Sequence, residues 1–533
     1  MRHILLLLLL GFAVTFTSCR DDFEFENSTG GLQFSKDTVY LDTVFSKIGS
    51  STYTLKVYNR SNKDIKIPNI QLGQGENSKY RLMVDGVPGK VFNNVELLAK
   101  DSMFVFIETT IDYSEYANNS TTFLYTDNIQ FTSTNGSQQV ELVTLVQDAI
   151  FMFPQRDNDG NYEAVRYDND LNPDTDAQYL YGFNLNPADE VNGNELHWTK
   201  DKPYVIYGYA TVPQGQTLTV DPGARIHFHA DSGLMVRPGA TLNINGAVSS
   251  DQKILENEVV FEGDRLEPDF SDIAGQWTGI LLMSGADNTI NHLTLKNANI
   301  GIFAQAPTGD DTTVPKLTIN NSQIYECTNF GLFASRSIIT GENVVANNAG
   351  QAAVALIAGG IYNFKYCTFA NYFSSYNQVP LLINDYRNAG DKAYVGDVVA
   401  NFDNCIIYGS GNIALSMEHK YPDNTTFKTK FNTCIIKLLD YTNQLNTNPL
   451  YPGTSNDAAK ADYTTSLLEK SFNAFNPKFA DPNNNKLFII TGDSAADGKA
   501  DATVSTQFTT DVIGASRTGT PDIGAYASRE AAE

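Results

Sequence analysis

Short runs of alternating apolar residues, separated by tight turns, dominate the stretch from Thr211 to Gly246. Leu218–Val220 and Leu242–Ile244 are two of these runs, and Gly, Pro, Asp or Ala stands between neighbouring runs. Alternation with a period of two predicts strands, and glycine and proline predict turns. The turns follow one another too closely for hairpins with long arms. The stretch therefore predicts a chain that bends every few residues and coils on itself, as a parallel β-helix does.

The same sequence pattern continues to about Leu439 as a loose repeat of strand, asparagine-containing turn, strand and glycine. The repeats recur about every 20 to 40 residues, and TINHLTLKNANIGIFA, KLTINNSQIYECTNFGLFA and VANFDNCIIYGSGNIALSM are three of them. A single coil cannot bury its own apolar face, so stacking against neighbouring coils has to stabilise it. We predict one continuous solenoid over residues 203–450, followed by its C-terminal end and a tail over 451–533. In this fold, Leu218–Val220 and Leu242–Ile244 pair in parallel.

Four of the five cysteines fall within the repeat. Each follows a turn-like segment, which predicts small apolar residues in equivalent inward positions of successive coils: Cys327, Cys367, Cys405 and Cys434. Adjacent rungs of a sheet lie about 4.8 Å apart, so disulfides between stacked cysteines are the alternative interpretation. None of the cysteines forms a CxxC pair, and the sequence therefore gives no support to a zinc or thioredoxin-like site.

Residues 1–19 have the organisation of a secretory signal. A basic start precedes an apolar run from Ile4 to Phe16, which is too short for a comfortable membrane span. The run ends in Phe-Thr-Ser-Cys and resembles a bacterial lipobox, which implies that Cys19 is acylated and anchors the chain. The acidic RDDFE that follows resembles the surface-export signal of Bacteroidota lipoproteins. We expect a lipid-anchored protein of the outer membrane that faces the cell exterior. The alternative is a cleaved signal followed by an ordinary solvated linker.

Residues 20–30 are expected to be a linker, and residues 31–148 form a second compositional block. About seven short alternating strands with polar turns between them suit a generic immunoglobulin-like sandwich. The phrases DTVYLDTVF, LKVYNRSNKDIKI and VDGVPG resemble the N-terminal domain common in Bacteroidota surface lipoproteins. The resemblance implies a spacer domain.

Residues 149–202 are expected to connect the two blocks, and they carry a crowd of aspartates in RDNDGNYEAVRYDNDLNPDTD. Aspartates at alternate positions, with Asn and Gly between them, can place oxygens around a hard cation. The candidate calcium ligands are Asp157, Asp159, Asp168 and Asp170. The twelve-residue EF-hand spacing is not met, and a solvated acidic loop is the alternative interpretation.

The repeat region resembles the right-handed parallel β-helix families, including the pectate-lyase-like superfamily. VPQGQTLTVDPGARIHF, GQWTGI and CTFANYF match a group of Bacteroidota β-helix lipoproteins, and FNPKFADPNNNKLFIITGDSAADGKAD resembles the tail of that group. The expected architecture is thus all-β, with an immunoglobulin-like β-sandwich before a right-handed parallel β-helix solenoid.

The chain is acidic, with 37 Lys and Arg residues against 61 Asp and Glu residues and a net charge of −24. Nucleic acids and anionic membrane surfaces select faces rich in Lys and Arg, so neither is the expected partner. The balance also weighs against a polyanionic glycan, unless calcium or a local basic groove intervenes.

We find no complete motif set of a β-helix polysaccharide hydrolase or lyase, whose chemistry needs paired carboxylates or calcium with a basic residue. Three weaker groups mix residues capable of acid–base work, and each is also typical of a polar rim between strands. They are the segment Asp264–Asp272, the run Asp385–Arg387 and the run Glu418–Tyr421. Trp277 is predicted to pack between a coil and a loop.

Insertions between coils suggest where a ligand sits, because variation in a solenoid collects on one face. The largest insertions are Glu262–Gly275, Ala306–Pro315 and Phe373–Asp397, and we hypothesise that they wall a common groove. Arg265, Tyr386 and Arg387 are the candidate ligand-binding residues, although ion pairs with neighbouring aspartates explain the arginines equally well.

Two function classes follow from these observations. We expect a non-catalytic cell-surface protein that binds an extracellular polysaccharide or a surface protein. The alternative is a polysaccharide lyase or glycoside hydrolase of the β-helix type. Two carboxylates about 5 to 10 Å apart that face a cleft would favour the enzyme.

Overall fold

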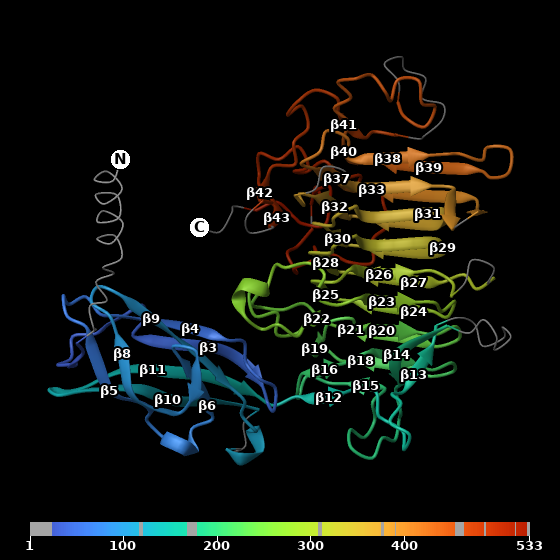
Figure 1. Cartoon of the computed structure of the whole chain (residues 1–533). Coiled ribbons are helices and arrows are strands. Elements are labelled where there is room, and N and C mark those ends of the chain that lie inside the picture. Colours follow the sequence, from blue (N-terminus) through green and yellow to red (C-terminus); the bar gives the residue numbers. More distant parts are fainter. Residues whose placement is uncertain are drawn as a thin grey trace, which may run out of the picture. The chain divides into compact units, whose positions relative to one another are not determined.

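The computed structural model describes residues 24–116, 121–167, 178–307, 312–374, 378–389, 391–452, 463–483, 487–517 and 519–529. The chain divides into two compact units between Asp148 and Ala149, and each unit has its own large hydrophobic core (Figure 1). Nearly all the regular structure in the described residues is strand, which confirms the predicted all-β class.

The first unit consists of two sheets that share one core. Along β9, for example, Met103, Val105 and Ile107 are buried and the residues between them are more exposed. One sheet contains β1 (Glu26–Asn27), β5 (Ile65–Leu72), β10 (Thr122–Ser133), β11 (Gly136–Gln147), β3 (Thr38–Phe45) and β8 (Val91–Leu97). The other contains β2 (Gln33–Phe34), β4 (Tyr53–Tyr58), β9 (Ser102–Thr109), β6 (Tyr80–Val84) and β7 (Val87–Gly89). The two-sheet arrangement fits a sandwich, and the immunoglobulin-like assignment stays a prediction.

The second unit is a parallel β-helix in which three stacks of parallel strands form the walls. Stack A contains β12 (Ile150–Met152), β16 (Tyr204–Ile206), β19 (Arg225–Phe228), β22 (Val259–Gly263), β25 (Leu293–Lys296), β28 (Gln323–Tyr325), β30 (Val345–Ala346), β32 (Thr368–Asn371), β37 (Ile406–Gly409), β40 (Ile435–Lys437) and β41 (Leu467–Glu469).

Stacks B and C are the two other walls, and they belong to one continuous sheet because β29 (Phe330–Glu342) and β31 (Ala352–Lys365) run through both. Stack B also contains β14 (Tyr179–Asn184), β17 (Tyr209–Val212), β20 (Gly233–Val236), β23 (Gly279–Leu282), β26 (Ile300–Ala304), β33 (Val379–Asn384) and β38 (Leu415–Glu418). Stack C also contains β15 (His197–Trp198), β18 (Thr217–Val220), β21 (Thr241–Asn245), β24 (Asn288–Asn291), β27 (Lys316–Asn320), β36 (Val398–Asp403) and β39 (Phe427–Asn432).

The pairing of β18 with β21 tests the solenoid prediction directly. The two strands are parallel, with Leu218 beside Leu242 and Val220 beside Ile244, so the β-helix is confirmed. The first rungs lie before residue 203, because β12, β14 and β15 already pair in parallel with later strands. Short strands and an acidic loop hide these rungs in the sequence. β13 (Ala164–Arg166) adds to β14 in the antiparallel direction.

A single residue with a left-handed backbone turns the chain from stack C to stack A in successive coils. Its φ lies between 47° and 57° at His292, Asn321, Asn343, Tyr366, Asn404 and Thr433. Asparagine tolerates this conformation better than most residues, which explains the asparagine-containing turns of the repeat.

The cysteines lie at two different corners of the coil rather than at one. Cys367, Cys405 and Cys434 each follow the left-handed residue between stacks C and A, whereas Cys327 follows Glu326 at the corner between stacks A and B. All four are buried free thiols, so the predicted inward position is correct and the disulfide alternative is not realised. Burial raises the pKa of the Cys327 thiol to about 12.

The C-terminal segment returns along the outer face of stack A. Phe488, on β43 (Leu487–Ile490), and Tyr526 pack against Val345 and Ala370, which point outward from β30 and β32. β43 pairs with β42 (Phe479–Asp481) in a small antiparallel sheet beside this stack (Figure 1). We call residues 487–529 the tail. It covers apolar side chains on several rungs and contributes one wall of the site described next.

Candidate functional site

Equivalent outward residues of stack A stand side by side because its strands are parallel and in register. One such row begins with His227, Glu262 and Lys296, and it continues with Tyr325 and Asn347. Lys296 Nζ lies 2.8 Å from Glu262 Oε2, and His227 Nδ1 lies 3.6 Å from Glu262 Oε1. The charged part of the row is therefore internally paired, and the row becomes uncharged at Tyr325.

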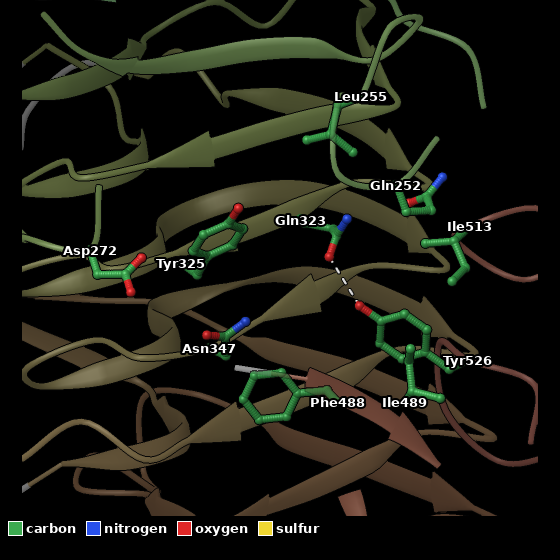
Figure 2. A pocket seen from close by; sticks show the side chains of 10 residues that line it. All are labelled: Gln252, Leu255, Asp272, Gln323, Tyr325, Asn347, Phe488, Ile489, Ile513 and Tyr526. Carbon is green, nitrogen blue, oxygen red and sulfur yellow. Dashed lines mark hydrogen bonds between the residues drawn. The ribbon is translucent and has the colours of Figure 1, made fainter. Parts of the chain in front are cut away.

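A pocket of about 270 Å³ lies over this uncharged part of the row. Gln323, Tyr325 and Asn347 form its floor on β28 and just after β30. The insertions 246–258 and 264–278 and the tail surround it, as Figure 2 shows. Seven residues form these walls: Gln252, Leu255, Asp272, Phe488, Ile489, Ile513 and Tyr526. We call this hollow the stack A pocket.

Specific hydrogen bonds hold the walls of the stack A pocket in place. The Arg225 guanidinium donates to the backbone carbonyls of Leu255 at 2.6 Å and Glu258 at 2.7 Å, so it fixes the insertion 246–258 to β19. Across the pocket, the Tyr526 hydroxyl donates to Gln323 Oε1 at 3.0 Å and ties the tail to the floor (Figure 2).

Asn347 supplies the most unusual atom of the pocket. Its side chain is only 2% exposed, and its Oδ1 has no hydrogen-bond partner among the described residues. An unpaired buried carbonyl oxygen costs about 1 to 3 kcal/mol, and native structures contain few of them. A ligand whose N–H or O–H group reached this oxygen would satisfy it.

Two further groups near the floor have raised pKa values. Burial raises the pKa of the Glu258 carboxyl, whose Oε2 accepts a 2.7 Å hydrogen bond from Thr294 Oγ1. Burial, together with the nearby carboxylates Glu262 and Glu258, raises the pKa of the Tyr325 phenol. The Tyr325 phenol therefore stays uncharged near neutral pH.

The lining is poor in carboxylates. Among the lining residues, Asp272 is the one carboxylate, and the other polar groups are amides and phenols. A glycosidase needs two carboxyl groups on either side of the scissile bond. The described residues also contain no group of three His, Cys, Asp or Glu side chains placed to hold a metal ion.

A second hollow lies at the first coils and is lined by Asn194, His197, Gln216 and Thr219, among others. His197 Nε2 and Asp221 Oδ2 lie 2.8 Å apart at its edge. None of its lining residues is among those with a buried side-chain polar atom that lacks a partner. This hollow therefore has no counterpart of Asn347 Oδ1.

Arg265, Tyr386 and Arg387 do not lie together in the structure. Arg265 pairs with Glu267 at 3.0 Å and stacks over the Phe270 ring, on the insertion between β22 and β23. Tyr386 and Arg387 begin β34 (Tyr386–Ala389), which follows β33 and pairs with β35 (Lys392–Val395). The two places are four rungs apart, or about 19 Å along the solenoid.

The hypothesis of one common wall is wrong for a geometric reason. The insertion Glu262–Gly275 leaves the coil between stacks A and B, and Ala306–Pro315 leaves it between stacks B and C. The third segment, Phe373–Asp397, contains β33 and so spans both corners. Sequence length identifies an insertion but not the corner at which it leaves the coil.

Two of the weak groups from the sequence do meet, because β33 pairs with β38. The fully buried Asp385 carboxylate accepts hydrogen bonds from the backbone N–H groups of Lys420 and Tyr421, both at 2.9 Å, and from Thr425 Oγ1. The Tyr386 hydroxyl donates to Glu418 at 2.6 Å, and this bond raises the pKa of Tyr386 to about 12. The cluster therefore braces a turn.

The remaining candidates have structural explanations or lie outside the described residues. Asp157 Oδ1 accepts from the backbone N–H groups of Asp159 and Asn161, so it closes its own loop. Asp168, Asp170 and Cys19 lie outside the described residues. Trp277 is a packing residue, but it packs inside the coils rather than between a coil and a loop: it is buried in the solenoid core and stacks on Phe228 with ring centroids 4.2 Å apart.

The sequence analysis did not identify Asn347, Gln323 or Tyr325. Alternation along β28 places Gln323 and Tyr325 on the outer face, and this is a signal that could have been read. The contribution of Tyr526 could not have been read, because the tail returns to β28 over about two hundred residues of sequence.

No family model matches the chain, and no curated protein matches it either. Among solved structures, a family 123 glycoside hydrolase from Clostridium perfringens is 11% identical over 23% of this chain and 28% of its own, with a TM-score of 0.16. The Vibrio cholerae VesB protease is 11% identical over 22% of this chain and 32% of its own, with a TM-score of 0.14. The pectate lyase Pel9A is 14% identical over 62% of this chain and 89% of its own, with a TM-score of 0.23. The chain thus spans less than a third of the first two proteins, and TM-scores of this size establish no common function.

Proposed function

We propose that the protein is a non-catalytic carbohydrate-binding protein whose binding site is the stack A pocket. One observation carries the proposal: Asn347, whose buried Oδ1 has no hydrogen-bond partner among the described residues, belongs to the lining of a hollow formed by amides and aromatic rings. Amide side chains offer both donors and acceptors to hydroxyl groups, and aromatic rings pack against the apolar faces of sugar rings. Concave sites with apolar walls and a few placed polar groups are typical of small-ligand binding.

The size of the pocket favours a sugar over a protein as the ligand. Specific protein partners bury about 800 Å² of surface on each side, whereas a hollow of about 270 Å³ encloses a small group. An enzyme of the lyase or hydrolase type has less support, because Asp272 has no second carboxylate beside it in the lining.

We also propose that the protein is a surface lipoprotein of the outer membrane, anchored through Cys19. The support comes from the sequence resemblance in residues 1–24. In the described residues, the structure contains no helix that is both long and apolar enough to cross a membrane. In cell fractionation, the Cys19→Ala variant should lose lipid labelling and leave the membrane fraction. Retention of the variant in membranes equal to wild type would contradict the anchor.

A glycan array probed with residues 20–533 tests the binding function, and product analysis on every hit tests the enzyme alternative. We expect saturable binding of at least one glycan without cleavage. Asn347→Ala should weaken that binding at least tenfold, because it removes the unpaired acceptor. The matched control is Asn446→Ala, an exposed residue outside the pocket, which should bind as wild type does. Equal binding by wild type and a folded Asn347→Ala protein would exclude this pocket as the site.

A further inference from the structure

We propose that the stack A pocket selects a neutral or amino sugar and rejects uronates and sulfated sugars. This inference rests on the proposed carbohydrate-binding function and names the class of sugar. The selectivity follows from the charges and hydrogen-bond acceptors of the lining residues, and not from the shape of the pocket alone.

The pocket has no positive group with which to receive an anion. None of its lining residues is Lys, Arg or His, and Asp272 adds a carboxylate. The two nearest cations on stack A are already engaged: Lys296 with Glu262 at 2.8 Å, and Arg225 with backbone carbonyls of the insertion 246–258. A uronate carboxylate would therefore lose water and gain only neutral donors beside the Asp272 carboxylate, which is unfavourable.

The lining holds donors in the amides of Gln323 and Asn347 and in the Tyr325 hydroxyl, and it also holds two acceptors that favour donors on the ligand. Asn347 Oδ1 is an acceptor without a partner, and the Asp272 carboxylate accepts hydrogen bonds only. The Tyr526 hydroxyl, a donor in the lining, is already used by Gln323 Oε1. Sugar hydroxyls, the N–H of an acetamido group and an ammonium group all supply such donors, whereas carboxylate and sulfate groups supply none.

The volume limits the recognised group to a small one. At about 270 Å³ the hollow lies just below the roughly 300–1,000 Å³ of drug-sized sites, which suits one sugar ring at a chain end or on a branch. Phe488, Ile489 and Leu255 supply apolar surface against the ring. A charged group on a single carbon of that ring would thus determine whether the sugar binds in the pocket.

Matched pairs of oligosaccharides test the proposal by calorimetry with residues 20–533. Each pair consists of a neutral or amino oligosaccharide found on the array, or of a glucan, galactan or mannan, and its counterpart oxidised to the carboxylate at C6. We expect the carboxylate member to bind at least tenfold more weakly. Asp272→Asn should reduce that ratio, because it removes the repelling charge, while Asn347→Ala should weaken both members.

The outcomes separate the two proposals. Equal or tighter binding of the carboxylate member would overturn the selectivity and leave carbohydrate binding intact. Absence of binding to every array glycan and every pair would overturn the proposed function itself. An unchanged ratio in a folded Asp272→Asn protein would show that the pocket does not set the selectivity, and would also overturn the inference.

Discussion

One residue in each coil turns the chain from stack C to stack A, and His292 does so where three later coils use asparagine. Asn343 donates its amide to Asn321 Oδ1 at 2.9 Å, and Asn321 donates to Asn291 Oδ1 at 3.0 Å. His292 makes no equivalent bond through Nδ1, which is buried without a partner among the described residues. Burial lowers the pKa of His292 to about 4, so the imidazole is neutral in the folded protein near pH 7.

The histidine at this corner predicts that the folded protein loses stability as the pH falls. The unfolded chain protonates His292 near its ordinary pKa of about 6.5, whereas the folded chain resists protonation down to about 4. The free energy of unfolding is therefore unaffected by His292 above about pH 6.5. It decreases as the pH falls from 6.5 toward 4, because the unfolded chain takes up a proton that the folded chain does not. We expect His292→Asn to recover on the order of 2 kcal/mol at pH 4.5 relative to wild type, after allowance for solvent screening.

Chemical denaturation at pH 7.5 and pH 4.5 measures this effect as the difference between the two proteins. His227, whose pKa burial also lowers, is present in both proteins and cancels in the difference. Parallel losses of stability in wild type and His292→Asn would show that the corner histidine does not titrate as argued.

At the scale of elements, the tail is fastened to the coils by one buried cation. Arg517 donates to Asn343 Oδ1 at 3.1 Å and to the Gly524 carbonyl at 2.8 Å, and its guanidinium lies 4.7 Å from the Tyr366 ring centroid. Asn343 and Tyr366 both belong to the corner between stacks C and A. Arg517 thus links the tail to the same row of left-handed residues that shapes the solenoid.

We predict that Arg517→Ala releases the tail before the solenoid unfolds. Removing one partner of a buried charged network costs about 3 kcal/mol. Limited proteolysis should cut within residues 487–529 at least tenfold faster than in wild type, and glycan binding should fall because Ile513 and Tyr526 line the pocket. The exposed Lys499→Ala on the same segment is the control and should digest as wild type does. Equal digestion of Arg517→Ala and the control would contradict the fastening role.

The strands of the solenoid could be predicted from the sequence, whereas the pocket could not. The strands of the solenoid could be predicted because their signal is local: Leu218 and Val220 point inward in a run of four residues. The stack A pocket could not, because Leu255, Tyr325 and Tyr526 meet only after the chain has coiled and returned. Arg265 and Tyr386 are predicted to share a groove but lie at different corners, because a sequence gives the size of an insertion without the corner from which it leaves.

At the scale of the whole molecule, the chain has two large cores that form separately. One core draws its buried residues from Leu32 to Val146, and the other draws them from Met152 to Tyr451. The boundary between the units, at Asp148 and Ala149, lies just before the first rung of stack A. A unit with its own sheets and its own core can in principle fold alone.

We therefore predict that residues 149–533 fold and bind glycan without the first unit. Calorimetry of residues 20–533 should show two transitions, and the transition of the 149–533 fragment should agree with one of them within about 2 °C. Its glycan affinity should match that of the longer chain, because every lining residue of the stack A pocket lies in the second unit. Residues 20–148 serve as the reciprocal control and should reproduce the other transition without binding. An unfolded 149–533 fragment, or a single transition in the longer chain that neither fragment reproduces, would show that the two cores depend on each other.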